Sequence, residues 1–224
     1  MNADEVLRRG PHWVIALAVG LVVCGASRAQ AIAGYPQSVE SLDLREVAML
    51  PHYCIYTQMF RDKVPGGNDK AVIDGWYAKL GTPFHALHHY CLGLMKTNRA
   101  LHHSRDRSTR DFYLTDAIME YDYVIDRSTD EFILLPEMLT KKGENLVLLG
   151  RGPRGIYEFE RAIQLKNDYW PPYAQISDFY KSTGDIKKAR ESLEAGLAQS
   201  PNATALQRRL VELESPVNRR SGKR

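Results

Sequence analysis

The sequence predicts an all-α protein in which antiparallel helix pairs stack into an α-α superhelix behind a helical N-terminal extension. Apolar residues between positions 173 and 197 recur at steps of three and four, the spacing of one face of a helix. Glycine and proline residues divide the chain into segments of helix length. No stretch shows the clean period of two that a half-buried strand requires.

The clearest helix pair lies between residues 170 and 201. Its first helix starts at two adjacent prolines, which fit only the first turn of a helix, and Gly184 ends it. Asp185 can cap the second helix through its carboxylate, and Pro201 stops that helix. The apolar positions of the pair are Tyr173, Ile176, Tyr180, Ile186, Ala189, Leu193 and Leu197. Each helix therefore has one apolar face that a neighbour must cover.

This stretch resembles a tetratricopeptide repeat (TPR), a helix pair with a period of about 34 residues. The matching positions are Tyr173, Ile176, Ser177, Tyr180, Gly184, Ala189, Leu193, Gly196 and Pro201. A second copy, one period earlier, matches at Leu139, Gly143, Leu146, Gly150, Gly155, Phe159 and Ala162. In this copy Lys142 replaces an apolar residue and Asn167 replaces the proline. The segment around Ala117, Tyr121 and Val124 fits the second helix of a further unit after a four-residue slip.

The resemblance implies a TPR-like solenoid of three units over residues 98–214, an architecture for stacking and binding rather than for a reaction. In such a solenoid the first helix of each pair lines the inner surface. The residues expected there are Glu137, Lys141, Asn145, Tyr173, Gln175, Asp178 and Lys181. The expected partner is another protein or a peptide of the cell envelope.

The N-terminus has the order of charges and apolar residues typical of a cleaved signal peptide. Arg8 and Arg9 precede an apolar run over residues 13–26, and a short polar segment with the sequence Ala-Gln-Ala at its end follows up to position 31. The run is too short to span a bilayer comfortably. Residues 1–31 are therefore predicted to direct export to the periplasm, with a retained N-terminal anchor helix as the alternative.

The charge balance does not favour nucleic acid as a partner. The chain has 30 Lys and Arg against 27 Asp and Glu, a formal net charge of +3. The segment 215–224 is expected to be a disordered tail, because its basic end, residues 219–224, lacks apolar residues. Any membrane contact is expected to be peripheral.

Residues 32–97 are predicted to form a helical segment that matches no repeat. Its expected elements are a helix interrupted at Pro51, a loop over 63–69, a short helix over 74–80 and one long helix over 83–101. Cys54 and Cys91 each follow a His-Tyr pair, and in an oxidising compartment two cysteines suggest a disulfide. Free buried thiols are the alternative.

Histidines are the only residues that point towards chemistry. His85, His88 and His89 have the spacing i, i+3, i+4, which places three imidazoles on one helix face, where they can bind zinc or copper. The alternative is that these rings pack in the core or are solvated. No complete metal, haem or catalytic signature is present, so we expect no cofactor and no enzymatic activity.

Two functions follow as hypotheses. The first is a periplasmic scaffold, adaptor or assembly factor of an envelope complex that binds its partner on a concave surface. The second is a histidine-rich metal-binding or redox-linked periplasmic protein.

Overall fold

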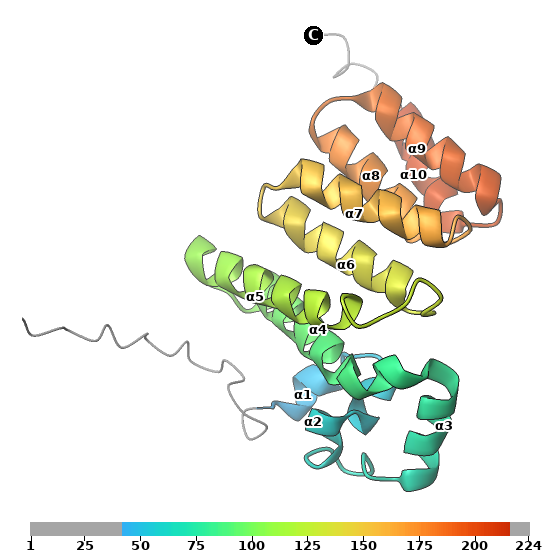
Figure 1. The fold of residues 1–224 in the computed structure, drawn as a ribbon. Helices are drawn as coiled ribbons and strands as arrows, with labels where there is room; N and C mark the ends of the chain where they lie inside the picture. The colour runs from blue at the N-terminus through green and yellow to red at the C-terminus, as the bar shows by residue number, and fades with distance from the viewer. Residues whose placement is uncertain (1–41, 216–224) are drawn as a thin grey trace, which may run out of the picture. The chain divides into compact units, whose positions relative to one another are not determined.

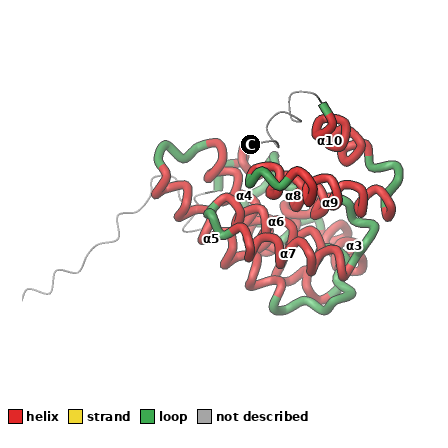
Figure 2. Tube along the Cα trace, turned by 90° about the horizontal axis from the view of Figure 1, so that it is seen from above, coloured by secondary structure: helices red, strands yellow, loops and turns green. Residues whose placement is uncertain are grey.

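A computed structural model describes residues 42–215. The predicted signal peptide, and the predicted tail except for Ser215, lie outside the described residues. The described part contains helices and loops and no strand (Figures 1 and 2), so the prediction of an all-α protein is confirmed. The elements in chain order are α1 (Leu44–Val47), η2 (His52–Tyr56), α2 (Gln58–Arg61), α3 (Lys70–Leu80), η3 (Thr82–Ala86), α4 (Leu87–His102), α5 (Arg107–Ile125), α6 (Leu135–Leu148), α7 (Gly152–Leu165), α8 (Pro171–Ser182), α9 (Ile186–Gln199) and α10 (Thr204–Glu214).

The N-terminal part consists of short helical turns around the start of α4. The helix α3 begins at Lys70, four residues earlier than expected, because the Asp69 carboxylate accepts a hydrogen bond from the Val72 amide and caps it. The expected single helix over 83–101 is wrong at its start. Residues 82–86 form the 3₁₀ turn η3, and the α-helix begins only at Leu87. A 3₁₀ turn is a common entry to an α-helix.

Residues 87–199 form three helix pairs, in which α4 packs on α5, α6 on α7 and α8 on α9, and α10 then packs on α9 (Figure 1). Short connections join the two helices of each pair, which makes them antiparallel neighbours. Between α8 and α9, Gly184 has a φ of 85°, and the Asp185 carboxylate accepts from the Lys188 amide at 3.0 Å, as the sequence predicted. The expected boundary at residues 97–98 falls inside α4, so the first pair starts at residue 87.

Each pair contains a glycine pressed against an aromatic ring of the partner helix. A Cβ on Gly93 would lie 2.3 Å from the Tyr121 ring, and one on Gly143 would lie 2.4 Å from the Phe159 ring. In the third pair, a Cβ on Gly196 would lie 2.8 Å from Tyr173. Because the rings are buried, these helices can approach so closely only where one side has no side chain.

Lys142 interrupts the apolar pattern of α6 because it joins three helices. Its ammonium lies 2.7 Å from the Asp122 carboxylate of α5 and 2.8 Å from the Glu158 carboxylate of α7. The side chain therefore links the first pair to the second at a position where the repeat pattern has an apolar residue.

A disulfide joins Cys54 in η2 to Cys91 in α4, and both cysteines are fully buried. The bond fastens the N-terminal turns to the first helix pair. Within residues 42–215, no helix combines the length and the apolar character needed to cross a membrane.

Replacing Gly143 with alanine should destabilise the protein by about 1–3 kcal/mol, because the new methyl group meets the buried Phe159 ring and the Gly155 carbonyl. Gly75→Ala is the matched control: it lies in α3, where a Cβ meets nothing within 4 Å, and should gain about 0.5–1 kcal/mol of helix stability. Urea unfolding measures both changes. Equal effects at the two sites would contradict the close-packing argument.

Removing the disulfide with Cys54→Ala and Cys91→Ala together should lower the free energy of unfolding by about 3–4 kcal/mol, because the open chain gains loop entropy when it unfolds. Denaturant titration of the oxidised protein and the double variant measures this difference. Without a reducing agent, the unfolded wild-type protein should resist alkylation at both positions, and labelling there would show that the pair is not formed.

Candidate functional site

A cavity of about 310 Å³ opens where α6 meets the start of α8, with α10 at its edge. Three helices that are distant in sequence therefore contribute to one site. Its lining residues are Glu137, Thr140, Lys141, Glu144, Tyr169, Trp170, Pro171, Ala174, Gln175 and Arg209. We call this the inner-face cavity.

The α6 wall of the inner-face cavity is a row of charged side chains. Glu137, Lys141 and Glu144 follow the spacing i, i+4, i+7, which keeps them on one helix face. The Lys141 ammonium lies 2.9 Å from the Glu144 carboxylate, whose other oxygen accepts a hydrogen bond from the Gln175 amide at 3.1 Å. Glu144 therefore ties α6 to α8 across the cavity.

Glu137 is surrounded by tyrosines that keep their protons. The Tyr90 hydroxyl donates to the Glu137 carboxylate at 2.7 Å. Burial, and then the nearby charge of Glu137, raise the pKa of Tyr53, Tyr90 and Tyr169 above the usual value of a phenol. The Tyr53 hydroxyl is buried and has no hydrogen-bond partner. These phenols therefore remain hydrogen-bond donors at neutral pH, and one of them is unused.

The outer edge of the cavity combines an aromatic ring with an ion pair. Trp170, just before α8, is 37% exposed. The Arg209 guanidinium of α10 lies 3.2 Å from the Asp178 carboxylate of α8. Two carboxylates and two basic groups line the cavity, so it has no strong net charge.

The structure brings together Glu137, Lys141 and Gln175, three of the residues expected on the inner surface. Of the others, Asp178 and Lys181 are exposed on α8 outside the cavity lining. Tyr173 is buried, with only 6% of its surface exposed, because it packs against Gly196.

The expectation that Asn145 is exposed is wrong, because its side chain is fully buried. Its amide donates to the Thr97 hydroxyl at 2.8 Å, so it joins α6 to α4. Eight residues after Glu137, a helix has turned by about 80° beyond two full turns, whereas seven residues leave it about 20° short. Glu144 therefore occupies the cavity face that the sequence analysis assigned to Asn145.

Trp170, Arg209 and Glu144 also line the cavity but were not predicted from the sequence. The spacing i, i+4, i+7 from Glu137 would have identified Glu144. Arg209 gives no such signal, since it joins the site through the packing of α10, which no repeat pattern indicated.

His88 and His89 of the predicted cluster contact different groups. The His89 Nδ1 atom lies 2.5 Å from the Glu120 carboxylate, and its ring stacks on Tyr123. The His88 Nδ1 atom lies 3.1 Å from the His85 carbonyl oxygen. Within residues 42–215, no group of three or more His, Cys, Asp or Glu side chains is arranged to hold a metal ion. The metal-binding alternative stays a prediction.

Behind His89, α4 and α5 share a buried charge cluster. The Lys96 ammonium lies 2.5 Å from both the Asp116 and the Glu120 carboxylates. Burial and the negative charge of Glu120 raise the pKa of Asp116 to about 6. Asp116 therefore holds its proton at a higher pH than an isolated aspartic acid does.

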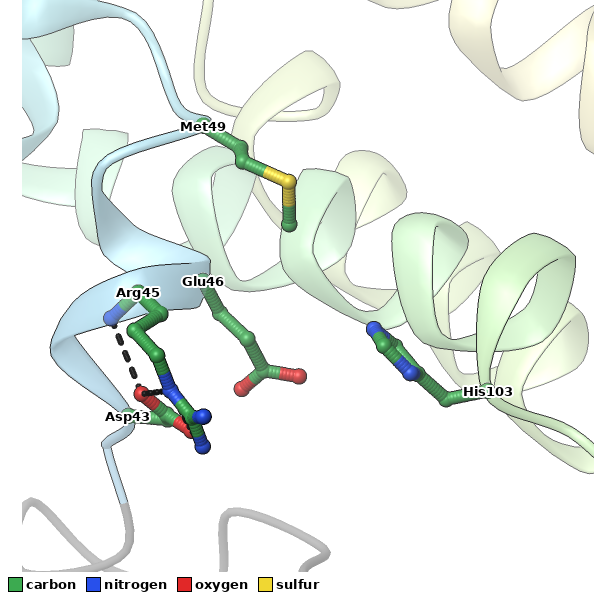
Figure 3. Close-up of a pocket in the computed structure, with 5 residues that line it drawn as sticks. All are labelled: Asp43, Arg45, Glu46, Met49 and His103. Carbon is green, nitrogen blue, oxygen red and sulfur yellow. Dashed lines mark hydrogen bonds and ion pairs between the residues drawn. The ribbon is translucent and has the colours of Figure 1, made fainter.

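A further cavity, of about 410 Å³, lies between α1 and the end of α4. Figure 3 shows the carboxylate of Glu46 and the ring of His103 facing this space from opposite sides. The charged residues Asp43, Arg45 and Glu46 of its lining are already in ion pairs: Arg45 lies 2.7 Å from Asp43, and Glu46 pairs with the buried Arg99. This cavity therefore offers less unused binding capacity than the inner-face cavity.

Comparison with known proteins gives no assignment: no family model matches the sequence, and no curated protein matches it significantly.

The stability of the protein should respond to the proton on Asp116. Because its pKa is raised in the folded state, its contribution to stability is present below about pH 4 and is lost as the pH rises towards 6. The Asp116→Asn variant should therefore become more stable relative to the wild type over this interval. Urea unfolding at a series of pH values measures the difference.

The Asp111→Asn variant is the control, because its stability relative to the wild type should change with pH in the opposite direction. The Arg110 guanidinium lowers the pKa of Asp111, so this carboxylate stabilises the fold above about pH 4 and loses that effect in acid. A pH-independent difference between wild type and Asp116→Asn would contradict the raised pKa.

Proposed function

We propose that residues 87–214 form a TPR-like solenoid whose inner surface holds a segment of another protein, and that the protein is a periplasmic scaffold, adaptor or assembly factor without a reaction of its own. The repeat pattern of the sequence and the succession of three helix pairs support this proposal. The first helices of the later pairs, α6 and α8, contact each other directly, as the inner helices of a solenoid do.

The inner-face cavity is the observation that carries the proposal. Its volume of about 310 Å³ is at the lower end of the range for ligand sites, which suits one side chain of a bound segment better than a whole small molecule. Trp170 supplies an exposed ring of the kind that dominates binding energy at interfaces. The charged row on α6 supplies hydrogen bonds to a polypeptide.

An extended segment is the favoured form of the partner. Glu137, Lys141 and Glu144 alternate in charge along α6, and Gln175 continues the row of polar groups onto α8. Because the charges balance, recognition rests on hydrogen bonds and on the Trp170 ring rather than on attraction to a strongly charged partner. A backbone with a regular series of donors and acceptors matches such a row.

The periplasmic location rests on the predicted signal peptide, and the Cys54–Cys91 disulfide is consistent with it. Disulfides persist in oxidising compartments and are rare in the cytosol. The partner is therefore sought among envelope proteins.

A photo-crosslinking residue placed at Lys181 on α8 should capture a discrete partner in intact cells, because this exposed side chain lies on the same helix as the cavity wall. The same residue at Tyr157, which is 59% exposed on α7, is the matched control and should not capture that partner. Mass spectrometry of the crosslinked species identifies the protein.

Trp170→Ala should weaken the captured interaction by about tenfold or more, because a tryptophan ring that a bound partner covers contributes about 2 kcal/mol. Tyr157→Ala should leave the affinity unchanged. Equal capture at positions 157 and 181, or unchanged affinity in Trp170→Ala, would argue against the inner-face cavity as the binding surface.

A further inference from the structure

A separate cavity of about 240 Å³ lies in the N-terminal part of the described chain. It is formed by η2, α2, α3 and η3, and it shares no lining residue with the inner-face cavity. Its walls include Tyr56, Arg61, Asp74, Tyr77, Phe84 and His85. We call it the Arg61 cavity.

Arg61 is the unusual feature of this wall. Its Nε atom is buried and has no hydrogen-bond partner. Among the residues that the structure describes, no carboxylate forms an ion pair with its guanidinium. A buried N–H donor without an acceptor costs free energy, and this cost is removed when a bound group accepts from it.

The acid in the same cavity does not neutralise Arg61. The Asp74 carboxylate is held by the Lys70 ammonium at 2.5 Å, an i, i+4 pair on α3. The positive charge of Arg61 is therefore available to a ligand, whereas Asp74 disfavours a second negative charge nearby.

The rest of the cavity wall is aromatic. The Tyr77 ring packs against the His85 ring with centroids 4.9 Å apart, and Tyr77 is 41% exposed. Phe84 and Tyr56 are buried and close the wall. Flat apolar groups bind favourably against such rings. The volume is smaller than that of a typical drug-sized site, so it fits a body about the size of one ring.

We propose that the Arg61 cavity binds a small monoanionic carboxylate with a flat apolar body, of the class represented by benzoate. Arg61 donates to the carboxylate, and the body of the ligand lies against Tyr77 and Phe84. A single guanidinium fork matches a carboxylate in geometry and charge, whereas a dianionic phosphate meets repulsion from Asp74. The disulfide at Cys54, two residues before Tyr56, fixes one wall of the cavity to α4.

Titration of the purified protein with benzoate, followed by calorimetry, tests the proposal. The expected result is saturable binding with a dissociation constant below about 10 mM, the range that ligand efficiency sets for a ligand of this size. Benzyl alcohol, which keeps the ring without the charge, and inorganic phosphate should each bind at least about tenfold more weakly. No saturable binding of benzoate in this range, or equal binding of either comparator, would overturn the proposal.

Two charge variants locate the site. Arg61→Gln should weaken benzoate binding by about tenfold or more, and Asp74→Asn should tighten it, because it removes a carboxylate that lines the cavity and repels the bound anion. Unchanged affinity in Arg61→Gln, or a comparable loss in Asp74→Asn, would overturn the assignment. If the unfolding temperature of Arg61→Gln differs from that of the wild type, the Tyr77→Ala variant tests the site instead. The Tyr77 ring is partly exposed, so its removal does not open the core. It should weaken benzoate binding by about fivefold or more, and unchanged affinity would count against the site.

Discussion

The close approach of glycine to an aromatic ring is the contact on which the helix pairs depend. Gly93 faces Tyr121, Gly143 faces Phe159 and Gly196 faces Tyr173, one contact in each of the three pairs. Where a ring fills the space that a side chain on the opposite helix would occupy, the two helix axes are fixed at one distance and one register. Gly152 meets the ring of Phe179 in the same way, and this contact joins α7 of the second pair to α8 of the third. The same kind of packing thus acts within pairs and between them.

Polar groups then set how successive pairs are joined. Asn145 donates to Thr97, whose hydroxyl lies 2.9 Å from that of Tyr121, so one buried chain of hydrogen bonds connects α6 with α4 and α5. Lys142 adds ion pairs on another side of α6. Buried polar groups are costly unless satisfied, and they therefore favour one arrangement of the pairs over its neighbours. The Glu144 contact to Gln175 extends this pattern to α8, where it also forms a wall of the inner-face cavity.

The N-terminal turns form the Arg61 cavity and also approach Glu137, a residue of the inner-face cavity. The charge of Glu137 acts on Tyr53, whose buried hydroxyl lies outside the lining of the inner-face cavity, whereas Tyr56 and Arg61 line the Arg61 cavity. The Cys54–Cys91 disulfide lies between these two tyrosines and holds the segment against α4. A segment that matches no repeat thereby forms the second proposed site. The two sites share no residue, so each can fail without the other.

The sequence by itself determined the helical class, the turn at Gly184 and Asp185, and the approximate bounds of α8 and α9, because these follow from local periodicity and capping. The resemblance to a TPR also placed Glu137, Lys141 and Gln175 on one surface, and these three residues line one cavity. Only the tertiary structure decided that Asn145 is buried, that Glu144 and Arg209 line the cavity, and that the buried Nε atom of Arg61 has no hydrogen-bond partner among residues 42–215. The physical reason is that burial and pairing depend on which helix packs against a given face. Residues far apart in the chain supply those contacts, and a local sequence pattern does not predict them.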